Sequence, residues 1–203
     1  MSFDTFSNTR GFSKEEIEKL GNTIIYLCEK MNGLQKTQCL KLIYLLDEMS
    51  IKKYGLPFLN LNYEVWKYGP VAQEVFIELS EPKILRDFIE LEHDSFNQYS
   101  FVNVKAKKEF NDDEFSDNDM LILDYVVKNF SDKNGTELVD FTHAPSSIWY
   151  KTAEENGVLE LFKKGLKNST NLMIDFSRLL DLDKKKIFND FIENRNMLKA
   201  YDF

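Results

Sequence analysis

Residues 65–76, VWKYGPVAQEVF, mark the point at which the hydrophobic pattern changes its period. Over residues 61–68 the side chains alternate and are rich in aromatic and β-branched types, which is typical of a strand. From residue 71 onward, apolar side chains recur at helical spacing. Pro70 suits the first turn of that helix, because it has no N–H to leave unpaired and its φ is already near the helical value. The stretch therefore predicts a strand, a corner at Gly69 and a helix.

Two helices are predicted before this stretch. The first begins at an S-x-x-E capping box formed by Ser13 and Glu16. The second covers residues 37–55 and carries apolar side chains over a face so wide that more than one neighbour must cover it. Gly55 is a typical C-terminal cap, and Pro57 follows it. We expect this second helix to lie at the centre of the domain.

Farther along the chain, the apolar spacing within residues 80–94 predicts another short helix, and residues 98–110 have the composition of a strand. This strand and the strand at 61–68 are expected to pair as a small antiparallel sheet. Four more helices are expected, with starts near Ser116, near Thr136, at Ser146 or Ser147, and at Asp181 or Asp183. The predicted fold class is mainly α (α+β): a single compact helical domain with a small antiparallel β-sheet.

The charge argues against nucleic acid as a partner of this chain alone. The formal net charge is −8, and acidic residues adjoin most of the short lysine runs. Binding to a phosphate backbone needs Lys and Arg gathered on one face, because the affinity comes largely from displaced counterions. An acidic protein is better suited to a basic protein partner, since opposite fields speed the encounter.

The location of the protein can be inferred from what the sequence lacks. Its apolar stretches are shorter than the roughly 20 residues that span a bilayer, and its N-terminus has no basic region followed by an apolar run. Cys28 and Cys39 do not form the pattern of a disulfide framework. We therefore expect a cytoplasmic protein without a membrane partner.

No catalytic constellation is visible in the sequence. The glycine motifs of phosphate-binding loops and nucleophile elbows are absent, and His93 and His143 do not have the spacing of a helical metal pair. We expect no enzyme, no cofactor and no metal. The His143 ring is expected to bond a helix end or to pack beside Trp149, and catalysis through His143 stays open as the alternative.

Large aromatic side chains are the candidates for contact with a partner. Such residues lie in the core more often than on a contact surface, and those that are exposed are the first anchors to test in an interface. Some flank the predicted corner and the turn near residue 143, and others lie on the C-terminal helix. The candidates are Trp66, Tyr68, His143, Trp149, Phe188 and Phe191.

Two ordered motifs occupy the centre of the chain. The first is a K-L-[LI]-Y helix with an aspartate three residues on, followed by an aromatic strand and Y-G-P-V; the second is L-x-x-x-T-H shortly before a tryptophan. This pattern resembles the Panacea domain, the family that includes SocA-like antitoxins and phage-associated GepA-type proteins. The motif residues are Lys41, Leu42, Tyr44, Asp47, Gly69, Pro70, Val71, Thr142, His143 and Trp149.

The resemblance implies an antitoxin, which neutralises a cognate protein toxin by direct binding and without catalysis. One alternative is the role of the family's adaptor members, which deliver the toxin to an ATP-dependent protease. Another is a nucleic-acid-binding transcriptional regulator. We expect a mobile N-terminus at residues 1–12, a Panacea-like antitoxin domain at 13–180, and an amphipathic C-terminal helix at 181–203 that carries partner specificity.

Overall fold

A computed structural model describes residues 11–31, 33–96 and 99–201, so most of the N-terminal segment for which we expect mobility, 1–12, lies outside the described residues. It confirms the predicted fold class, with helices around two small antiparallel sheets. The helices are α1 (Lys14–Lys30), α2 (Lys36–Tyr54), α3 (Gln73–Glu78), α4 (Asp117–Phe130), α5 (Gly135–Thr142), α6 (Ile148–Glu155), α7 (Leu159–Lys163), the 3-10 helix η1 (Phe176–Leu179) and α8 (Leu182–Tyr201). The strands are β1 (Leu34–Gln35), β2 (Glu64–Trp66), β3 (Gly69–Val71), β4 (Ile89–Phe96) and β5 (Tyr99–Ala106).

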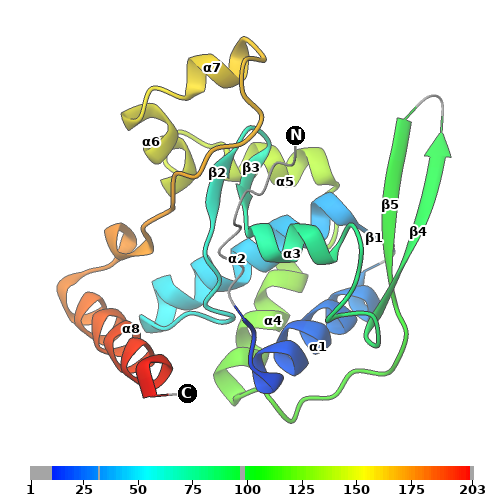
Figure 1. The fold of residues 1–203 in the computed structure, drawn as a ribbon, viewed down its shortest axis with the longest axis horizontal. Helices are drawn as coiled ribbons and strands as arrows, with labels where there is room; N and C mark the ends of the chain where they lie inside the picture. Colours follow the sequence, from blue (N-terminus) through cyan, green and yellow to red (C-terminus); the bar gives the residue numbers. More distant parts are fainter. Residues whose placement is uncertain (1–10, 32, 97–98, 202–203) are drawn as a thin grey trace, which may run out of the picture.

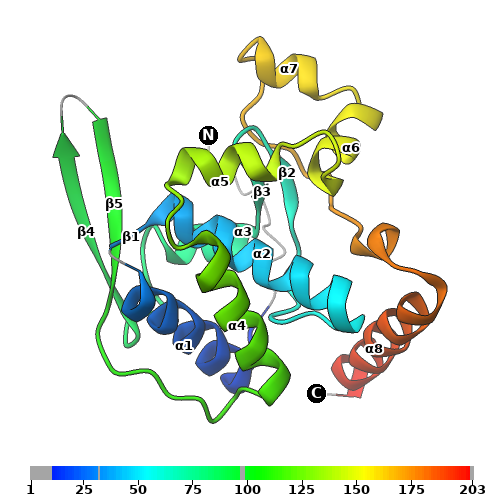
Figure 2. The same ribbon diagram turned by 180° about the vertical axis from the view of Figure 1, so that it is seen from behind.

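Helix α2 is the centre of the molecule, as predicted (Figure 1). It contacts α4, α5 and α8 as well as β1, β3 and β5, and every residue from 39 to 48 is buried. Gly55 ends the helix in the left-handed conformation, with a φ of 72°. Seen from behind, α1 and α4 lie side by side at one end of the molecule, and α6 and α7 lie at the other (Figure 2). The wide apolar face of α2 is therefore explained by neighbours on several sides.

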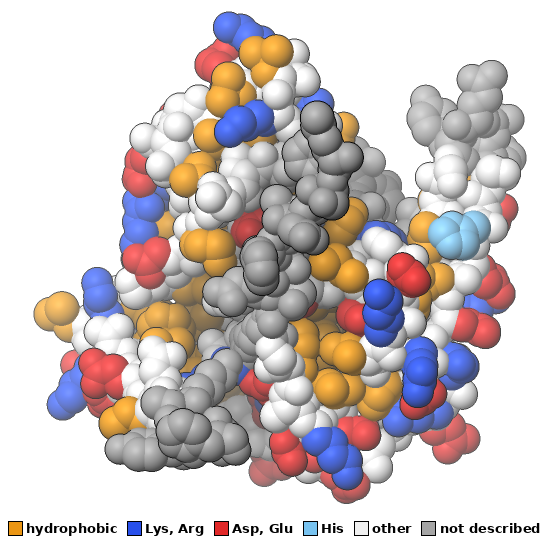
Figure 3. Space-filling view, viewed as in Figure 1, with side chains coloured by type: hydrophobic (Ala, Val, Ile, Leu, Met, Phe, Trp, Pro, Cys, Tyr) orange, Lys and Arg blue, Asp and Glu red, His pale blue; other side chains and the backbone are white. Residues whose placement is uncertain are grey.

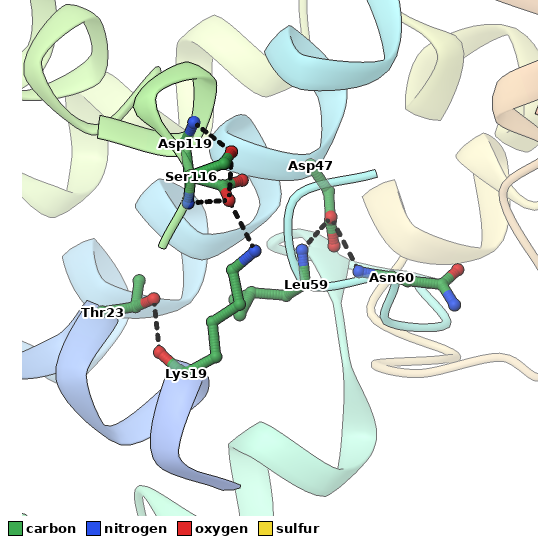
Figure 4. Close-up of polar contacts among 7 residues, drawn as sticks. All are labelled: Lys19, Thr23, Asp47, Leu59, Asn60, Ser116 and Asp119. Atoms are coloured by element: carbon green, nitrogen blue, oxygen red, sulfur yellow. Dashed lines mark hydrogen bonds and ion pairs between the residues drawn. The ribbon is translucent and has the colours of Figure 1, made fainter. Parts of the chain in front are cut away.

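Local capping fixes the ends of α1 and α4. The predicted capping box of Ser13 and Glu16 is present, and Ser116 forms a second box with Asp119 at the start of α4. Lys19 of α1 reaches the second box, with 3.0 Å between Nζ and the Asp119 Oδ2, and so ties the two helices together (Figure 4). The helices expected near residues 136, 147 and 181 are also present, as α5, α6 and α8.

The strand pairing differs from the prediction. β2 pairs with β3 as a hairpin, while β5 pairs with β4 and β1 in a separate sheet. The predicted pairing between residues 61–68 and 98–110 is therefore wrong. Strands that are adjacent in the sequence close with a short turn, and a short loop costs little conformational entropy.

Pro70 lies in β3, so its predicted place in the first turn of a helix is also wrong. Gly69 has a φ of 99°, which permits a tight turn at residues 67–68 before the chain folds back. Pro70 stands opposite Val65 at the middle of the hairpin. Alternate pairs of an antiparallel ladder exchange no hydrogen bonds, so a residue without an N–H fits there. Val65 accordingly donates its N–H to the carbonyl of Leu172, on the other side of β2.

The short helix predicted within residues 80–94 is absent. Its place is taken by turns and by β4, which begins at Ile89. The carboxylate of Glu78, in the last turn of α3, accepts hydrogen bonds from the three successive backbone N–H groups of residues 83–85. These bonds hold the segment as a turn, and pairing with β5 then keeps the chain extended.

The C-terminal part of the chain returns to the hairpin. Residues 168–174 run beside β2, and the N–H of Lys67 donates to the carbonyl of Asn168 at 2.9 Å. Farther on, the start of α8 packs against the end of α2. The two are so close that a Cβ at Gly55 would lie 2.9 Å from the carbonyl oxygen of Lys184. Residues 168–174 are thus anchored to the β2–β3 hairpin, and the start of α8 is anchored to the end of α2.

Candidate functional site

The motif residues come from three separate segments and meet around the β2–β3 hairpin. Lys41 of α2 donates from Nζ to the carbonyl of Pro70, at 2.9 Å. Trp149 of α6 donates from Nε1 to the carbonyl of Trp66, at 3.0 Å. The hairpin is therefore held by hydrogen bonds from two helices that are far apart in the sequence.

Gly69 permits this close approach. A Cβ at this position would lie 2.8 Å from the hydroxyl oxygen of Thr142 and 3.0 Å from Nζ of Lys41. Thr142 is itself buried and donates to the carbonyl of Val139 at 2.9 Å. Any side chain at position 69 would displace both neighbours, and the positive φ would strain it as well.

Lys41 is a buried cation, with only 2% of its surface exposed. Its ammonium group can donate three hydrogen bonds, and one acceptor, the carbonyl of Pro70, is found for it among the described residues. Burial lowers the pKa of Lys41 to about 7. A buried charge without an ionic partner costs stability, and groups perturbed in this way cluster at functional sites.

Asp47, by contrast, is a buried anion surrounded by donors. Its Oδ1 accepts from the N–H groups of Leu59, at 2.7 Å, and Asn60, at 3.0 Å (Figure 4). Its Oδ2 accepts from the N–H of Leu61 at 3.2 Å and from the hydroxyl of Tyr63 at 2.8 Å. Burial raises the pKa of Asp47, and these hydrogen bonds oppose the rise. Asp47 therefore fixes the chain that leads from α2 into β2.

Three further motif residues are part of the core. Leu42, Tyr44 and Val71 are buried. The ring of Tyr44 lies edge-on to that of Tyr63, with 5.2 Å between centroids, and stacks on Phe176 at 5.8 Å. The contact between Tyr44 and Phe176 packs α2 against the C-terminal part of the chain.

His143 packs beside Trp149, as predicted. The ring centroids are 3.8 Å apart and the planes differ by 7°. Burial, and secondarily the charge of Lys41, lower the pKa of His143 to about 4, so the ring is neutral at pH 7. Its Nε2 is buried without a hydrogen-bond partner among the described residues. The ring thus offers a flat neutral surface for stacking.

A cavity opens between α2, α5 and the hairpin, and we call it the hairpin cavity. Its volume is about 530 Å³. Lys41 is the one charged residue among the described residues that line it. Most of the remaining wall is apolar or aromatic, contributed by Leu40, Trp66, Tyr68, Val71, Phe76 and Val139.

Among the candidates for partner contact near the hairpin, only Tyr68 is strongly exposed. It lies in the turn and exposes 63% of its surface. Trp66 is half-buried, contacts Phe76 with 5.0 Å between ring centroids, and lines the cavity. Trp149 is 3% exposed, and His143 is half-buried against it.

The candidates on α8 lie elsewhere. Phe188 and Phe191 are half-buried and line two pockets that face the body of the molecule. Among the side chains of this helix that the structure describes, the exposed apolar ones are instead Leu182, Ile187 and Met197. The structure therefore does not bring the six candidates into one surface.

Sequence reasoning named Lys41, Trp66, Tyr68 and Val71 but missed the cavity that they line and its walls at Phe76 and Val139. Phe76 and Val139 each lie on the apolar side of a short amphipathic helix, which was a readable signal. No local pattern indicates that these two helices line the same cavity beside α2. A lysine inside the apolar run CLKLIYLL was the clearest available sign of a buried charge.

The described residues give no sign of metal or membrane chemistry. They contain no group of His, Cys, Asp and Glu that could hold a metal ion, and none of their helices is long and apolar enough to cross a membrane. On the face drawn in Figure 3, the coloured side chains of Lys and Arg are mixed with those of Asp and Glu, without a continuous basic patch.

Comparison with known proteins places this arrangement in a family. A family model described as antitoxin SocA-like, Panacea domain, matches residues 40–150, which is more than half of the chain and includes all three converging segments. No curated protein and no solved structure matches the chain. The chain therefore belongs to the SocA-like antitoxin family with a Panacea domain.

Proposed function

We propose that this protein neutralises a protein toxin by binding it directly at the tip of the β2–β3 hairpin. The observation that carries the proposal is the position of Tyr68. It is exposed at the point where the motif segments meet, while Lys41 and Trp149 donate hydrogen bonds to the backbone of the hairpin. Tyrosine is one of the residue types in which binding hot spots are enriched.

The other motif residues support a binding role. Asp47 holds a turn, His143 stacks as a neutral ring, and Trp149 bonds the hairpin backbone. Each contact stabilises the surface and involves no assembled nucleophile, acid or base. Membership of an antitoxin family likewise suggests a role without catalysis.

The net charge of −8 suits a basic toxin, because opposite fields steer the two proteins together. Helix α8 lies outside the matched region and exposes Leu182, Ile187 and Met197. We infer that this helix adds contacts that differ between toxins, so that the hairpin provides a shared anchor and α8 provides specificity.

The test is co-expression with the open reading frame next to the gene of this protein. We expect that neighbour to stop growth alone, to be harmless together with this chain, and to co-purify with it. A stable complex of this type buries on the order of 1,600 Å². Protection that requires an ATP-dependent protease, with loss of the toxin, would instead indicate delivery for degradation. If the neighbouring protein does not stop growth, the chain still belongs to the family, but the proposed toxin-neutralising function is refuted.

Two matched variants locate the surface. Tyr68→Ala should weaken the complex and reduce protection, because it removes the exposed side chain without touching the core. Tyr125→Ala is the control, since Tyr125 is 48% exposed on α4 and lies outside the converging motif segments. Equal effects of the two variants would place the binding surface elsewhere.

A further inference from the structure

The hairpin cavity has the size and the walls of a site for a small molecule. Its volume of about 530 Å³ falls within the range of known ligand pockets, which are mostly apolar with a few polar groups that orient the ligand. Phe76 and Val139 face it from α3 and α5, and Trp66 borders it from the hairpin. Such walls favour a ligand with an apolar body.

The charge of the cavity lining determines which polar group that ligand would carry. Lys41 is the only charged side chain among the described residues that line the cavity, and no described carboxylate forms an ion pair with it. Its ammonium group has one acceptor, the carbonyl of Pro70, for three donors. A ligand carboxylate would supply both the missing acceptors and the missing negative charge.

We propose that the hairpin cavity binds a small apolar monocarboxylate, with its carboxylate at Lys41 and its apolar body against Phe76 and Val139. This site goes beyond the toxin-binding function and does not depend on it. Gly69 contributes by leaving the end of Lys41 free of a neighbouring side chain, because a Cβ there would lie 3.0 Å from Nζ.

Binding should be accompanied by the uptake of a proton. With its pKa lowered to about 7, Lys41 is mostly neutral at pH 8, and a bound carboxylate would restore its charge. Three other titratable groups lie near this corner. They are His143, whose pKa is lowered in part by Lys41, Asp140, which raises the pKa of His143, and Lys36, whose ammonium lies 3.8 Å from the centre of the Phe76 ring and whose pKa is lowered by burial. The His143 ring is already neutral at pH 8, and loss of the uptake in Lys41→Met would assign it to Lys41 and not to Lys36.

The experiment is titration calorimetry of the full chain at pH 8, without toxin, in two buffers of different ionisation enthalpy. The probes are phenylacetate, indole-3-acetate and octanoate, each compared with its own primary amide. We expect at least one acid to bind at least about tenfold more tightly than its amide, with uptake of up to one proton. A neutral amide has the same body and lacks only the charge.

Three variants make the test specific. Lys41→Met should abolish the preference for the acid and the proton uptake, while Lys53→Met, at an exposed position of the same helix, should keep both. Val139→Phe should weaken acid and amide alike by filling the cavity. Circular dichroism checks that each variant is folded.

The proposal is overturned by any of three results in folded protein. The first is that no acid binds more tightly than its amide, including the case of no binding up to about 5 mM. The second is that the preference for the acid survives in Lys41→Met. The third is that Val139→Phe leaves the affinity unchanged. Because the toxin is absent, none of these results bears on toxin neutralisation.

Discussion

Replacing Lys41 by methionine should stabilise the protein at low pH and not at high pH. The pKa of Lys41 falls from 10.5 to about 7 on folding because of burial. At about 1.4 kcal/mol per pKa unit, this difference corresponds to roughly 4 to 5 kcal/mol lost when the charged side chain is buried. Methionine has a similar length and no charge, so it removes this cost.

The sign of the pH dependence follows from the protons bound. Between pH 7 and 10.5 the unfolded chain holds the proton on Lys41 and the folded chain does not, so the stability of the wild type rises with pH across this window. Below pH 7 both states are protonated and the full cost applies. The variant also loses the hydrogen bond to Pro70, which contributes about 1 kcal/mol.

Lys41→Met should therefore exceed the wild type by up to about 3 kcal/mol in free energy of unfolding at pH 6, and the difference should approach zero near pH 10. Urea denaturation at five pH values between 6 and 10 measures this, with Lys53→Met as the exposed control. A variant that is less stable than the wild type at pH 6, or a difference that does not change with pH, would refute the assignment of an unpaired buried cation.

Three other substitutions test the remaining parts of the site. Asp47→Ala should lower the free energy of unfolding by about 3 kcal/mol or more in chemical denaturation, because it leaves four donors without their shared acceptor. His143→Phe keeps a flat ring against Trp149. The wild type should lose stability as the pH falls from 6.5 toward 4, because in this range only the unfolded state binds a proton on His143. Thermal melts of the variant should lack this contribution to the loss of stability. Tyr68→Ala should change the free energy of unfolding by less than about 0.5 kcal/mol while weakening the toxin complex at least about tenfold in binding assays, which separates contact from packing.

The elements that could be predicted from the sequence are those with local causes. The capping box at Ser13 involves groups three residues apart, and the left-handed cap at Gly55 depends on one residue's own backbone freedom. The burial of α2 was readable from the width of its apolar face. Such features require no knowledge of what lies across the core.

The errors arose where distant groups decide between two locally allowed structures. A Y-G-P-V corner can enter a helix or turn back as a hairpin, and the contacts of Pro70 with Val65 and Lys41 select the hairpin. Residues 80–94 have helical spacing, but the carboxylate of Glu78 holds their first half as a turn. Neither partner is visible in the local pattern.

The same limit applies to the candidate site. Tyr68 and Trp149 are both large aromatic residues beside a turn, yet one is 63% exposed and the other 3%. The difference comes from the hydrogen bond of Trp149 to the hairpin backbone and from its stacking on His143, which depend on the meeting of three segments. The sequence alone was enough to name Tyr68 and Trp149 as candidates. The structure was needed to show that Tyr68 is exposed and that Trp149 is buried beneath the surface.

The most direct test of toxin binding at the hairpin is a cross-linking measurement in cells. A photoreactive phenylalanine analogue is placed at position 68 in one variant and at position 125 in another, and each is co-expressed with the neighbouring toxin. We predict a covalent adduct with the toxin from position 68 and none from position 125. Protection from the toxin together with an adduct from position 125 alone would contradict binding at the hairpin.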